Sequence, residues 1–314
     1  MHCDLGYCLL YALAGVGAYA AFLFLYECGR SPVRILWSLI FPNKDPLSVR
    51  YGPWAVITGS SDGIGKEYAI NLAGKGMNVF LMARTESKLK EVAEEIRSQS
   101  SVEVKWLAVD FSKGPEIYDT IRRALSGHVV GILVNNVGMA HQTPMDFDRL
   151  LKQDLLKSIS VNVQAAVMMT HMLLPEMKRR RRGMIVNMSS AGGLFSMPFG
   201  SIYGASKAFL CSFSTALSEE LRGTGVECQL VIPLFILTNL TKHMKTTLWW
   251  SALASRVDHF TKFAVFTIGR TDLTTGFWTH GLELTFLRLV TSRIVTRGTY
   301  IALAPVRNKL YGKT

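Results

Sequence analysis

The stretch Trp54-Ala-Val-Ile-Thr-Gly-Ser-Ser-Asp-Gly-Ile-Gly65 decides the fold. Its first five residues form a short apolar run with β-branched side chains, which is typical of a strand buried on both faces. The glycine-rich residues 59–65 follow directly, and a helical pattern begins at Lys66. Glycines between a strand and a helix let the backbone approach a pyrophosphate, whose charge then lies at the helix N-terminus. The stretch therefore predicts a dinucleotide-binding unit, although many turns between strands and helices also contain glycine.

A second strand is predicted at Asn78–Ala83, one βαβ unit further along the chain, and it ends at Arg84. An acidic residue at this strand end would bind a ribose 2′-hydroxyl, whereas an arginine accommodates a 2′-phosphate. Because residues 78–85 contain no Asp or Glu, the sequence favours NADP(H) over NAD(H). The alternative is a solvated arginine at a helix end. A third strand, Glu103–Val109, ends at Asp110, whose carboxylate suits either the adenine amino group or a helix cap.

The N-terminal residues 6–26 carry no charge and are numerous enough to span a bilayer as a helix, which takes about 20 residues. A cleaved signal peptide fits less well, because only His2 and Asp4 precede the apolar run and a basic n-region is missing. A buried core helix would have to be apolar all round. The basic flank that follows places the rest of the chain in the cytoplasm. We therefore predict a membrane anchor at residues 1–30 and a proline-containing linker at 31–50.

The composition is strongly basic, with a formal net charge of +12 and 49% hydrophobic residues. Such a balance suits an anionic partner, for example a membrane surface or a phosphorylated ligand. Nucleic acid is not expected, because the sequence has neither zinc-finger spacing nor a basic stripe interleaved with aromatic residues. The five cysteines are odd in number and form no CxxC pair, so the sequence predicts neither a disulfide framework nor a metal site.

Several motifs resemble those of the short-chain dehydrogenase/reductase family, and their order and spacing match over roughly residues 54–238. They are Thr58-Gly-Ser-Ser-Asp-Gly-Ile-Gly65, Asn135-Asn-Val-Gly138, Asn162, Ser190 and Tyr203-Gly-Ala-Ser-Lys207. This resemblance implies one α/β domain at residues 51–314, built as a Rossmann-like doubly wound parallel sheet. With the N-terminal segment, the expected architecture is this domain behind a transmembrane helix.

Within the family, the sequence is similar to the membrane-bound 17-beta-hydroxysteroid dehydrogenase / very-long-chain 3-oxoacyl-CoA reductase group and to its hydroxysteroid dehydrogenase-like branch. The similarity lies in the anchor, in Arg84 and in five further stretches: Tyr51–Gly59, Gly131–Gly138, Asp110–Ser112, Glu116–Tyr118 and Thr275–His280. Members of that branch can lack the catalytic tyrosine, whereas this chain keeps Tyr203. The resemblance implies an endoplasmic reticulum membrane, with a mitochondrial membrane as the alternative, and a homodimer.

The residues Tyr203 and Lys207 are spaced to lie on the same face of a helix. A tyrosine with an ordinary pKa near 10 is a weak base at neutral pH, and a nearby ammonium favours its phenolate. By resemblance, Tyr203 is the catalytic acid/base and Lys207 also binds the nicotinamide ribose. Ser190, preferred to Ser189 because of its spacing from the tyrosine, orients the substrate oxygen. Asn162 supports a proton relay to the lysine. In isolation, each residue also fits an ordinary helix face or a strand-end cap.

The resemblance places NADP(H) against the glycine-rich loop, three strand ends and the loop after the sixth strand. The predicted contacts are Gly59, Ser60, Ser61, Asp62, Gly63, Ile64, Gly65, Arg84, Asp110, Asn136, Gly138, Lys207, Pro233 and Thr238. The family usually has Pro-Gly after the sixth strand, here predicted at Glu227–Ile232, but this chain has Pro233-Leu234. Since leucine tolerates a positive φ poorly, we expect this loop to follow a different path.

Three further stretches have two interpretations each. Lys178–Arg182 is either a solvated helix C-terminus or a contact for an anionic membrane or a CoA phosphate. Residues 240–281, which contain Trp249, Trp250, Phe260, Phe263, Phe266 and Trp278, form either a lid over a large apolar substrate or ordinary packing. Leu282–Ala304 is apolar but interrupted by arginines, which favours an amphipathic helix lying on a membrane over a second span.

Together these observations predict an NADPH-dependent oxidoreductase that interconverts a lipophilic ketone and its alcohol. The resemblance implies a steroid 17-keto/17-hydroxy group or a 3-oxoacyl-CoA as the substrate. The alternative function is a catalytically weak protein that binds NADP(H) together with a lipid or protein partner. The unusual Pro233-Leu234 loop keeps this alternative open, whereas the intact Tyr203/Lys207 pair counts against it.

Overall fold

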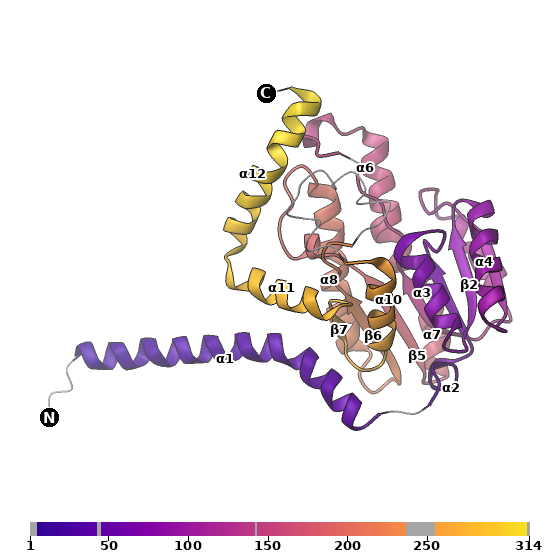
Figure 1. Cartoon of the computed structure of the whole chain (residues 1–314), viewed down its shortest axis with the longest axis horizontal. Coiled ribbons are helices and arrows are strands. Elements are labelled where there is room, and N and C mark those ends of the chain that lie inside the picture. The colour runs from indigo at the N-terminus through magenta and orange to yellow at the C-terminus, as the bar shows by residue number, and fades with distance from the viewer. Residues whose placement is uncertain (1–4, 43–44, 142, 237–254, 313–314) are drawn as a thin grey trace. The chain divides into compact units, whose positions relative to one another are not determined.

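The computed structural model of the chain describes residues 5–42, 45–141, 143–236 and 255–312. The chain divides into two compact units, Met1–Asn43 and Lys44–Thr314, which we call the N-terminal unit and the C-terminal unit (Figure 1). The division lies within the linker predicted at 31–50. The C-terminal unit holds the whole sheet, so the dinucleotide-binding fold belongs to it alone.

The N-terminal unit is a single long helix, α1 (Leu5–Ile40). Its segment Gly6–Ile40 is long and apolar enough to cross a membrane and contains an 18-residue stretch with a mean hydropathy of 2.0, although a signal sequence would meet the same criterion. The helix continues past residue 30, the predicted end of the anchor, and through Pro32 to Ile40. The residues after Pro32 are again mostly apolar, and proline interrupts only one turn of hydrogen bonding, which long apolar helices tolerate.

Seven parallel strands form one sheet in the order β3-β2-β1-β4-β5-β6-β7, which confirms the predicted doubly wound architecture. Their bounds are β1 Trp54–Thr58, β2 Asn78–Ala83, β3 Val104–Ala108, β4 Val130–Asn135, β5 Gly183–Met188, β6 Val226–Val231 and β7 Leu273–Thr274. The chain reverses its direction of winding between β1 and β4. In such sheets, ligands bind outside the carboxyl ends of the strands at this switch point.

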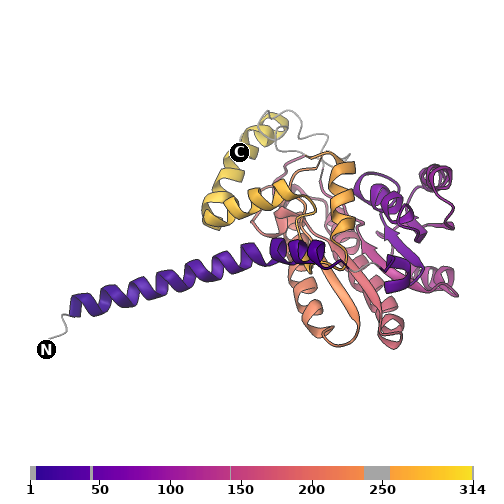
Figure 2. The ribbon, with the colours of Figure 1, turned by 60° about the horizontal axis from the view of Figure 1, so that its bottom comes forward.

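Helices cover both faces of the sheet (Figures 1 and 2). The helices are α2 Leu47–Tyr51, α3 Gly63–Ala73, α4 Glu86–Gln99, α5 Ile117–Leu125, α6 Lys152–Ile159, α7 Ala165–Arg179, α8 Ser201–Glu220, α10 Val257–Phe266, α11 Trp278–Leu289 and α12 Ser292–Tyr311. Short turns of 3-10 helix occur at Phe147–Arg149 and Ala191–Gly193, and a π-helical turn at Ser160–Gln164 joins α6 to α7.

Alternate side chains of each strand feed two separate cores. Ala55 and Ile57 of β1 pack with α3, α4 and α10, whereas Val56 packs with α5, α7 and α8 on the opposite face. Because both faces are covered, every residue of β1 is buried. This double burial explains why the strand reads in the sequence as a continuous apolar run.

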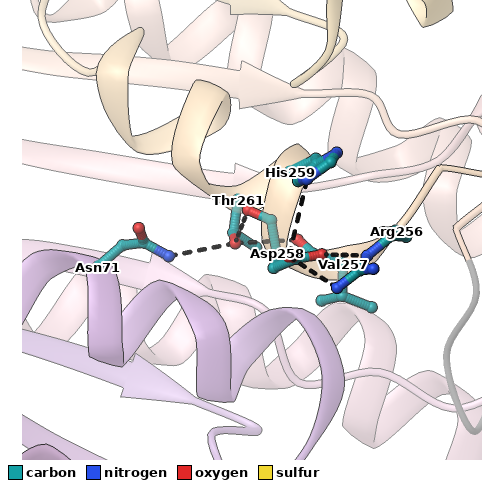
Figure 3. Close-up of polar contacts among 6 residues, drawn as sticks. All are labelled: Asn71, Arg256, Val257, Asp258, His259 and Thr261. Atoms are coloured by element: carbon teal, nitrogen blue, oxygen red, sulfur yellow. Dashed lines mark hydrogen bonds and ion pairs between the residues drawn. The ribbon is translucent and has the colours of Figure 1, made fainter.

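Part of the predicted substrate lid at 240–281 belongs to the sheet and its core. Phe260 of α10 is 0% exposed and lies in the core under the sheet, and β7 pairs with β6. Helix α10 is held on α3 by a hydrogen bond from Asn71 Nδ2 to Thr261 Oγ1 of 3.2 Å (Figure 3). For the described residues 255–281, these contacts favour the packing interpretation. Residues 237–254, with Trp249 and Trp250, lie outside the described residues.

The predicted helix at Leu282–Ala304 is two helices, α11 and α12. Val290 and Thr291 separate them, and both have extended backbone conformations. Both residues are β-branched, which disfavours helix, and the new helix begins after Thr291 as its N-cap residue.

The basic run Lys178–Arg182 packs onto the amino ends of the strands. Arg180 Nη2 donates a hydrogen bond to the carbonyl of Val130 at 2.7 Å, and Arg182 Nη1 donates to that of Val49 at 3.2 Å. Arg180 and Arg182 thus satisfy one backbone carbonyl at the start of β4 and one in α2. The helix-terminus interpretation of the run is the one that these contacts favour.

Candidate active site

A cleft of about 620 Å³ opens at the carboxyl ends of the strands, at the switch point between β1 and β4. Its walls carry most of the residues that the sequence singles out. From the predicted set, the lining includes Gly59, Ser61, Asp62, Gly63, Ile64, Arg84, Asp110, Asn136, Gly138, Ser190, Tyr203, Lys207 and Pro233. Residues from distant parts of the sequence therefore meet at one site.

The glycine-rich loop is built so that backbone reaches the cleft without side chains. Gly59 and Gly63 have φ values of 69° and 57°, which favour glycine. A Cβ added at Gly59 would lie 2.8 Å from Val137 Cα, and one added at Gly65 would overlap the carbonyl oxygen of Gly59. The loop ends at Asp62, whose side chain accepts a hydrogen bond from Gly63 N and caps α3. This cradle fits a dinucleotide pyrophosphate at the helix N-terminus.

Two polar side chains hold the loop in place. Asn136 Nδ2 donates hydrogen bonds to the carbonyls of Thr58 and Gly59 at 3.0 and 3.1 Å. In return, Thr58 Oγ1 accepts from the backbone N–H of Asn136 at 3.0 Å. Ser60, predicted to contact the cofactor, is instead buried, and its hydroxyl accepts from the N–H of Met82 at 3.0 Å. Thr58, which the sequence analysis did not assign a role, and Ser60 therefore position the loop from behind.

Arg84 and Asp110 lie at the outer end of the cleft. The Arg84 side chain is exposed, and β2, after which it stands, contains no acidic residue. Burial raises the pKa of Asp110, but a hydrogen bond from Ser112 and the charge of Arg84 outweigh it, so the net pKa falls below its ordinary value. An exposed guanidinium at this strand end fits a ribose 2′-phosphate. The residues present thus fit NADP(H).

The inner end of the cleft holds Tyr203 and Lys207, which extend from the first turns of α8. Lys207 is 4% exposed, and its Nζ donates a hydrogen bond to the carbonyl of Met188 at 2.9 Å. The same Nζ lies 5.8 Å from the centroid of the Tyr203 ring. Burial disfavours the ammonium and lowers the pKa of Lys207 to about 8.

Ser190 completes this cluster. Its hydroxyl accepts a hydrogen bond from the N–H of Gly192 at 3.2 Å and also forms a hydrogen bond with the Tyr203 side chain. Burial raises the pKa of Tyr203, and the bond with Ser190 offsets only part of that rise. The expectation of a favoured phenolate is therefore not met by this chain alone, because desolvation dominates. The neighbouring Ser189 donates its hydroxyl to the carbonyl of Lys207 at 2.7 Å, so geometry also favours Ser190 over Ser189.

Asn162 lies behind this cluster, in the π-helical turn. Its Oδ1 accepts from the N–H of Met139 at 2.7 Å, and its Nδ2 donates to the carbonyl of Met139 at 2.8 Å. A Cβ added at Gly138 would lie 3.5 Å from both Asn162 Oδ1 and Lys207 Nζ. The buried amide thus fixes the backbone beside the lysine. A π-turn widens a helix locally, and such turns are frequent at functional sites.

The family described as short chain dehydrogenase matches residues 53–249, which include the glycine loop and the Tyr203/Lys207 pair. The chain belongs to this family. A very-long-chain 3-oxoacyl-CoA reductase of Rattus norvegicus is 42% identical over 242 residues, covering 76% of each chain. An inactive hydroxysteroid dehydrogenase-like protein 1 of Homo sapiens is 38% identical over 288 residues, covering 89% of this chain and 86% of the relative.

Among solved structures, a short-chain dehydrogenase from Sphingobium yanoikuyae in complex with NADPH is similar with a TM-score of 0.65. It is 30% identical, and the match covers 71% of this chain and 87% of that one. The similarity to the 3-oxoacyl-CoA reductase and hydroxysteroid dehydrogenase-like proteins confirms the predicted group. The present chain is thus an NAD(P)-dependent oxidoreductase acting on CH–OH groups.

In the present chain, the loop after β6 reaches the cleft without the glycine that the family usually has after the proline. Pro233 and Leu234 line the cleft, and the carbonyl of Pro233 accepts from the N–H of Ala191 at 2.9 Å. Leu234 is not among the described non-glycine residues with a positive φ. The predicted difference in backbone path is thereby accommodated without strain. Thr238, predicted to contact the cofactor, lies outside the described residues.

Beyond this loop, the chain is fastened at Ile236 and Ser255, which form a parallel bridge. His280 lies beside the bridge, fully buried, with its Nε2 3.0 Å from Ser255 Oγ. Burial lowers the pKa of His280, and hydrogen bonds with the backbone of Thr275 and Phe235 offset part of the change. His280 therefore supports the wall of the cleft from outside. This role was not predicted, because His280 stands out in the sequence only as the last residue of the Thr275–His280 stretch.

Helix α12 is fastened to the loop that follows β4. Arg307 Nη2 lies 2.9 Å from Asp146 Oδ1 in a largely buried ion pair. Near the end of the helix, the Tyr311 hydroxyl lies 2.8 Å from Thr143 Oγ1. We call these two contacts the C-terminal latch. Sequence reasoning missed it, because neither Asp146 nor Arg307 stands in a recognisable pattern.

Proposed function

We propose that this chain is a membrane-anchored, NADPH-dependent reductase that converts a lipophilic ketone into an alcohol. The convergence of Tyr203, Ser190 and Lys207 beside the glycine-rich cradle carries this proposal. A proton donor next to a dinucleotide cleft is the arrangement that carbonyl reduction requires.

In the proposed reaction, NADPH bound in the cleft supplies a hydride to the carbonyl carbon. Tyr203 donates its phenolic proton to the carbonyl oxygen, which becomes the alcohol oxygen. Ser190 donates a hydrogen bond to the same oxygen and orients it. The Lys207 ammonium stabilises the phenolate that remains. Burial raises the pKa of Tyr203 above its ordinary value near 10, so the phenol keeps its proton at neutral pH and can donate it in the reduction.

We assign NADPH rather than NADH because of Arg84, whose exposed guanidinium follows a strand without acidic residues. The phosphate would form a charge-assisted hydrogen bond there, whereas the ribose hydroxyl of NADH would find no carboxylate on this strand. The bacterial relative with bound NADPH supports the same choice.

For the substrate, we put a 3-oxoacyl-CoA first and a steroid 17-ketone second. The 42% identity to a very-long-chain 3-oxoacyl-CoA reductase supports the first. The cleft also has an apolar part, formed by Met139, Leu234 and Ile236, that suits a lipid chain. The net charge of +12 suits the phosphates of CoA. A steroid would use the same apolar wall but not the charge.

A second candidate function is a catalytically weak protein that binds NADP(H) and a lipid or protein partner. The human relative named as inactive matches 89% of this chain, which is the observation that favours this candidate. It shares the fold and the cleft with the first proposal. Only turnover therefore separates the two.

The test is NADPH oxidation by the full chain in vesicles, with a panel of 3-oxoacyl-CoAs and steroid ketones. Wild type is compared with Tyr203→Phe and with Tyr19→Phe, a control in α1. We expect Tyr203→Phe to lower kcat by roughly 10²–10⁴-fold and the control to leave it unchanged. Binding of NADPH, followed by its fluorescence, should persist in both variants. Wild-type turnover as low as that of Tyr203→Phe, with NADPH still bound, would support the binding-protein function instead.

We further propose that α1 anchors the protein in the endoplasmic reticulum membrane with the C-terminal unit in the cytoplasm. The candidate span in α1 and its basic flank support this topology. Protease added to sealed microsomes should digest the C-terminal unit, and protection of that unit would contradict the topology. A homodimer through α6 and α8 is also proposed, since Leu156, Ile159 and Phe209 are exposed there. The test is the mass of the protein in detergent, and the mass of a single chain would contradict the homodimer.

A further inference from the structure

Helices α11 and α12 each present an apolar face to solvent, and we call the two faces together the stripe. On α11 the stripe consists of Leu282, Phe286 and Leu289, and on α12 of Ile294, Gly298, Ile301 and Pro305. Both sets follow the i, i+4, i+7 spacing that places residues on one face of a helix. The five large side chains of the stripe are 60–67% exposed, which is unusual for side chains of this size lying in a row.

The opposite sides of these helices pack inward. Leu284 of α11 and Arg307 of α12 are buried, and the C-terminal latch ties α12 to the loop after β4. Figures 1 and 2 both show α11 and α12 at the periphery of the C-terminal unit. The stripe is therefore the outward face of helices that are held firmly on their inner side.

The charges of these helices indicate what covers the stripe. Residues 278–311 contain one acidic residue, Glu283, whose pKa burial raises, a shift that favours its neutral form. Arg293 and Arg297 are exposed and precede Ile294 and Gly298 of the stripe by one residue each. An apolar stripe bordered by arginines is the pattern of a helix that lies in the interface of an anionic bilayer.

A second copy of the chain fits the stripe less well. A symmetric pairing of two stripes would place the arginines of one copy near those of the other, and like charges at an interface are costly. If α1 spans a bilayer, that bilayer is also available to the C-terminal unit. The residues between Ile40 and Leu47, which reach no more than about 25 Å even when extended, keep the C-terminal unit tethered to the bilayer that α1 would span.

We propose that the α11–α12 stripe docks onto an anionic lipid surface, with its apolar side chains among the acyl chains and Arg293 and Arg297 at the phosphates. The latch then has a functional meaning. It connects the docked helix to the loop after β4, which also carries Met139 of the cleft. A lipophilic substrate dissolved in the bilayer would meet the protein next to its active site. The docking itself does not depend on the proposed reaction.

The test uses the full chain reconstituted in phosphatidylcholine vesicles, with or without phosphatidylserine. A photoreactive benzophenone amino acid replaces Phe286 in one variant and Ile301 in a second. In a control variant it replaces Val129, an exposed apolar residue outside α11 and α12. After illumination, intact mass and peptide mapping show whether each position is joined to lipid or to protein. Each variant is first checked for NADPH binding, so that loss of the fold is recognised separately from loss of docking.

We expect lipid adducts at positions 286 and 301 at least several-fold above the Val129 control. Phosphatidylserine should increase them, and the double variant Arg293→Glu/Arg297→Glu should lower them roughly fivefold or more. Cross-links to a second chain or to α1, or lipid adducts no higher than those of the control, would overturn the proposal. If neither phosphatidylserine nor the arginine variant changed the yield of lipid adducts, the electrostatic part of the proposal would be overturned.

Discussion

Replacing Lys207 with methionine is expected to change the free energy of unfolding in a pH-dependent way. Lys207 is almost completely buried, and burial lowers its pKa from 10.5 to about 8 in the folded chain. The unfolded chain therefore binds the proton more tightly than the folded chain does. Below pH 8, the wild type carries the full cost of a buried ammonium, and this cost disappears as the pH rises towards 10.5.

The magnitude follows from the two pKa values. A difference of one pKa unit corresponds to about 1.4 kcal/mol, so the lowered pKa of Lys207 costs about 3 kcal/mol at pH 7. At pH 9.5 only about 1 kcal/mol of that cost remains. Lys207→Met also removes a donor from the carbonyl of Met188, which costs about 1–3 kcal/mol at every pH. The stability of the variant relative to wild type should therefore fall by about 2 kcal/mol between pH 7 and pH 9.5.

The measurement is urea unfolding of both proteins in detergent, without cofactor, followed by tryptophan fluorescence at the two pH values. Lys75→Met, at an exposed lysine, serves as the matched control and should show no comparable pH dependence. A stability difference between Lys207→Met and wild type that stays constant with pH would refute the reasoning. A stability of Lys207→Met relative to wild type that rises towards alkaline pH would refute it as well.

Three other predictions concern the cofactor cradle, the 2′-phosphate and the latch. Gly65→Ala should weaken NADPH binding at least about tenfold in a fluorescence titration, because the new Cβ overlaps the carbonyl of Gly59. Arg84→Glu should raise the KM for NADPH by about tenfold or more and leave that for NADH nearly unchanged; equal effects on both would contradict the assignment. Arg307→Met removes the nearer of the two arginines that pair with the partly buried Asp146, the other being Arg149, and should lower the free energy of unfolding by about 1–3 kcal/mol. The double variant with Asp146→Leu should recover most of this loss, and a loss that persists there would exclude the ion pair as its cause.

The strands β1 and β2 could be predicted to the residue because they are buried on both faces. Such strands appear in the sequence as unbroken apolar runs, and the glycine loop marks where the first one ends. The pair Tyr203 and Lys207 could be found because one turn of a helix sets their spacing. These features depend on local geometry, which a single sequence carries directly.

Features that depend on tertiary contacts were out of reach. Strand β7 has only two residues, and it forms because β6 offers it an edge to pair with. Phe260 looked like part of a substrate lid, because an aromatic residue in an apolar stretch is equally typical of a lid and of a core helix. His280 and the Asp146–Arg307 pair join residues distant in the sequence, and no local pattern marks such partners. The raised pKa of Tyr203 likewise reflects burial, which the motif alone did not reveal.

Because Ile236 and Ser255 form a bridge, the architecture of the sheet does not depend on the number of residues that join them. Both ends are fixed, one by the strand it follows and one by α10 and His280. For a flexible connection, doubling the number of residues costs only about 0.6 kcal/mol of closure entropy. Evolution could therefore lengthen, shorten or exchange that connection while the sheet and the cofactor cradle stayed unchanged.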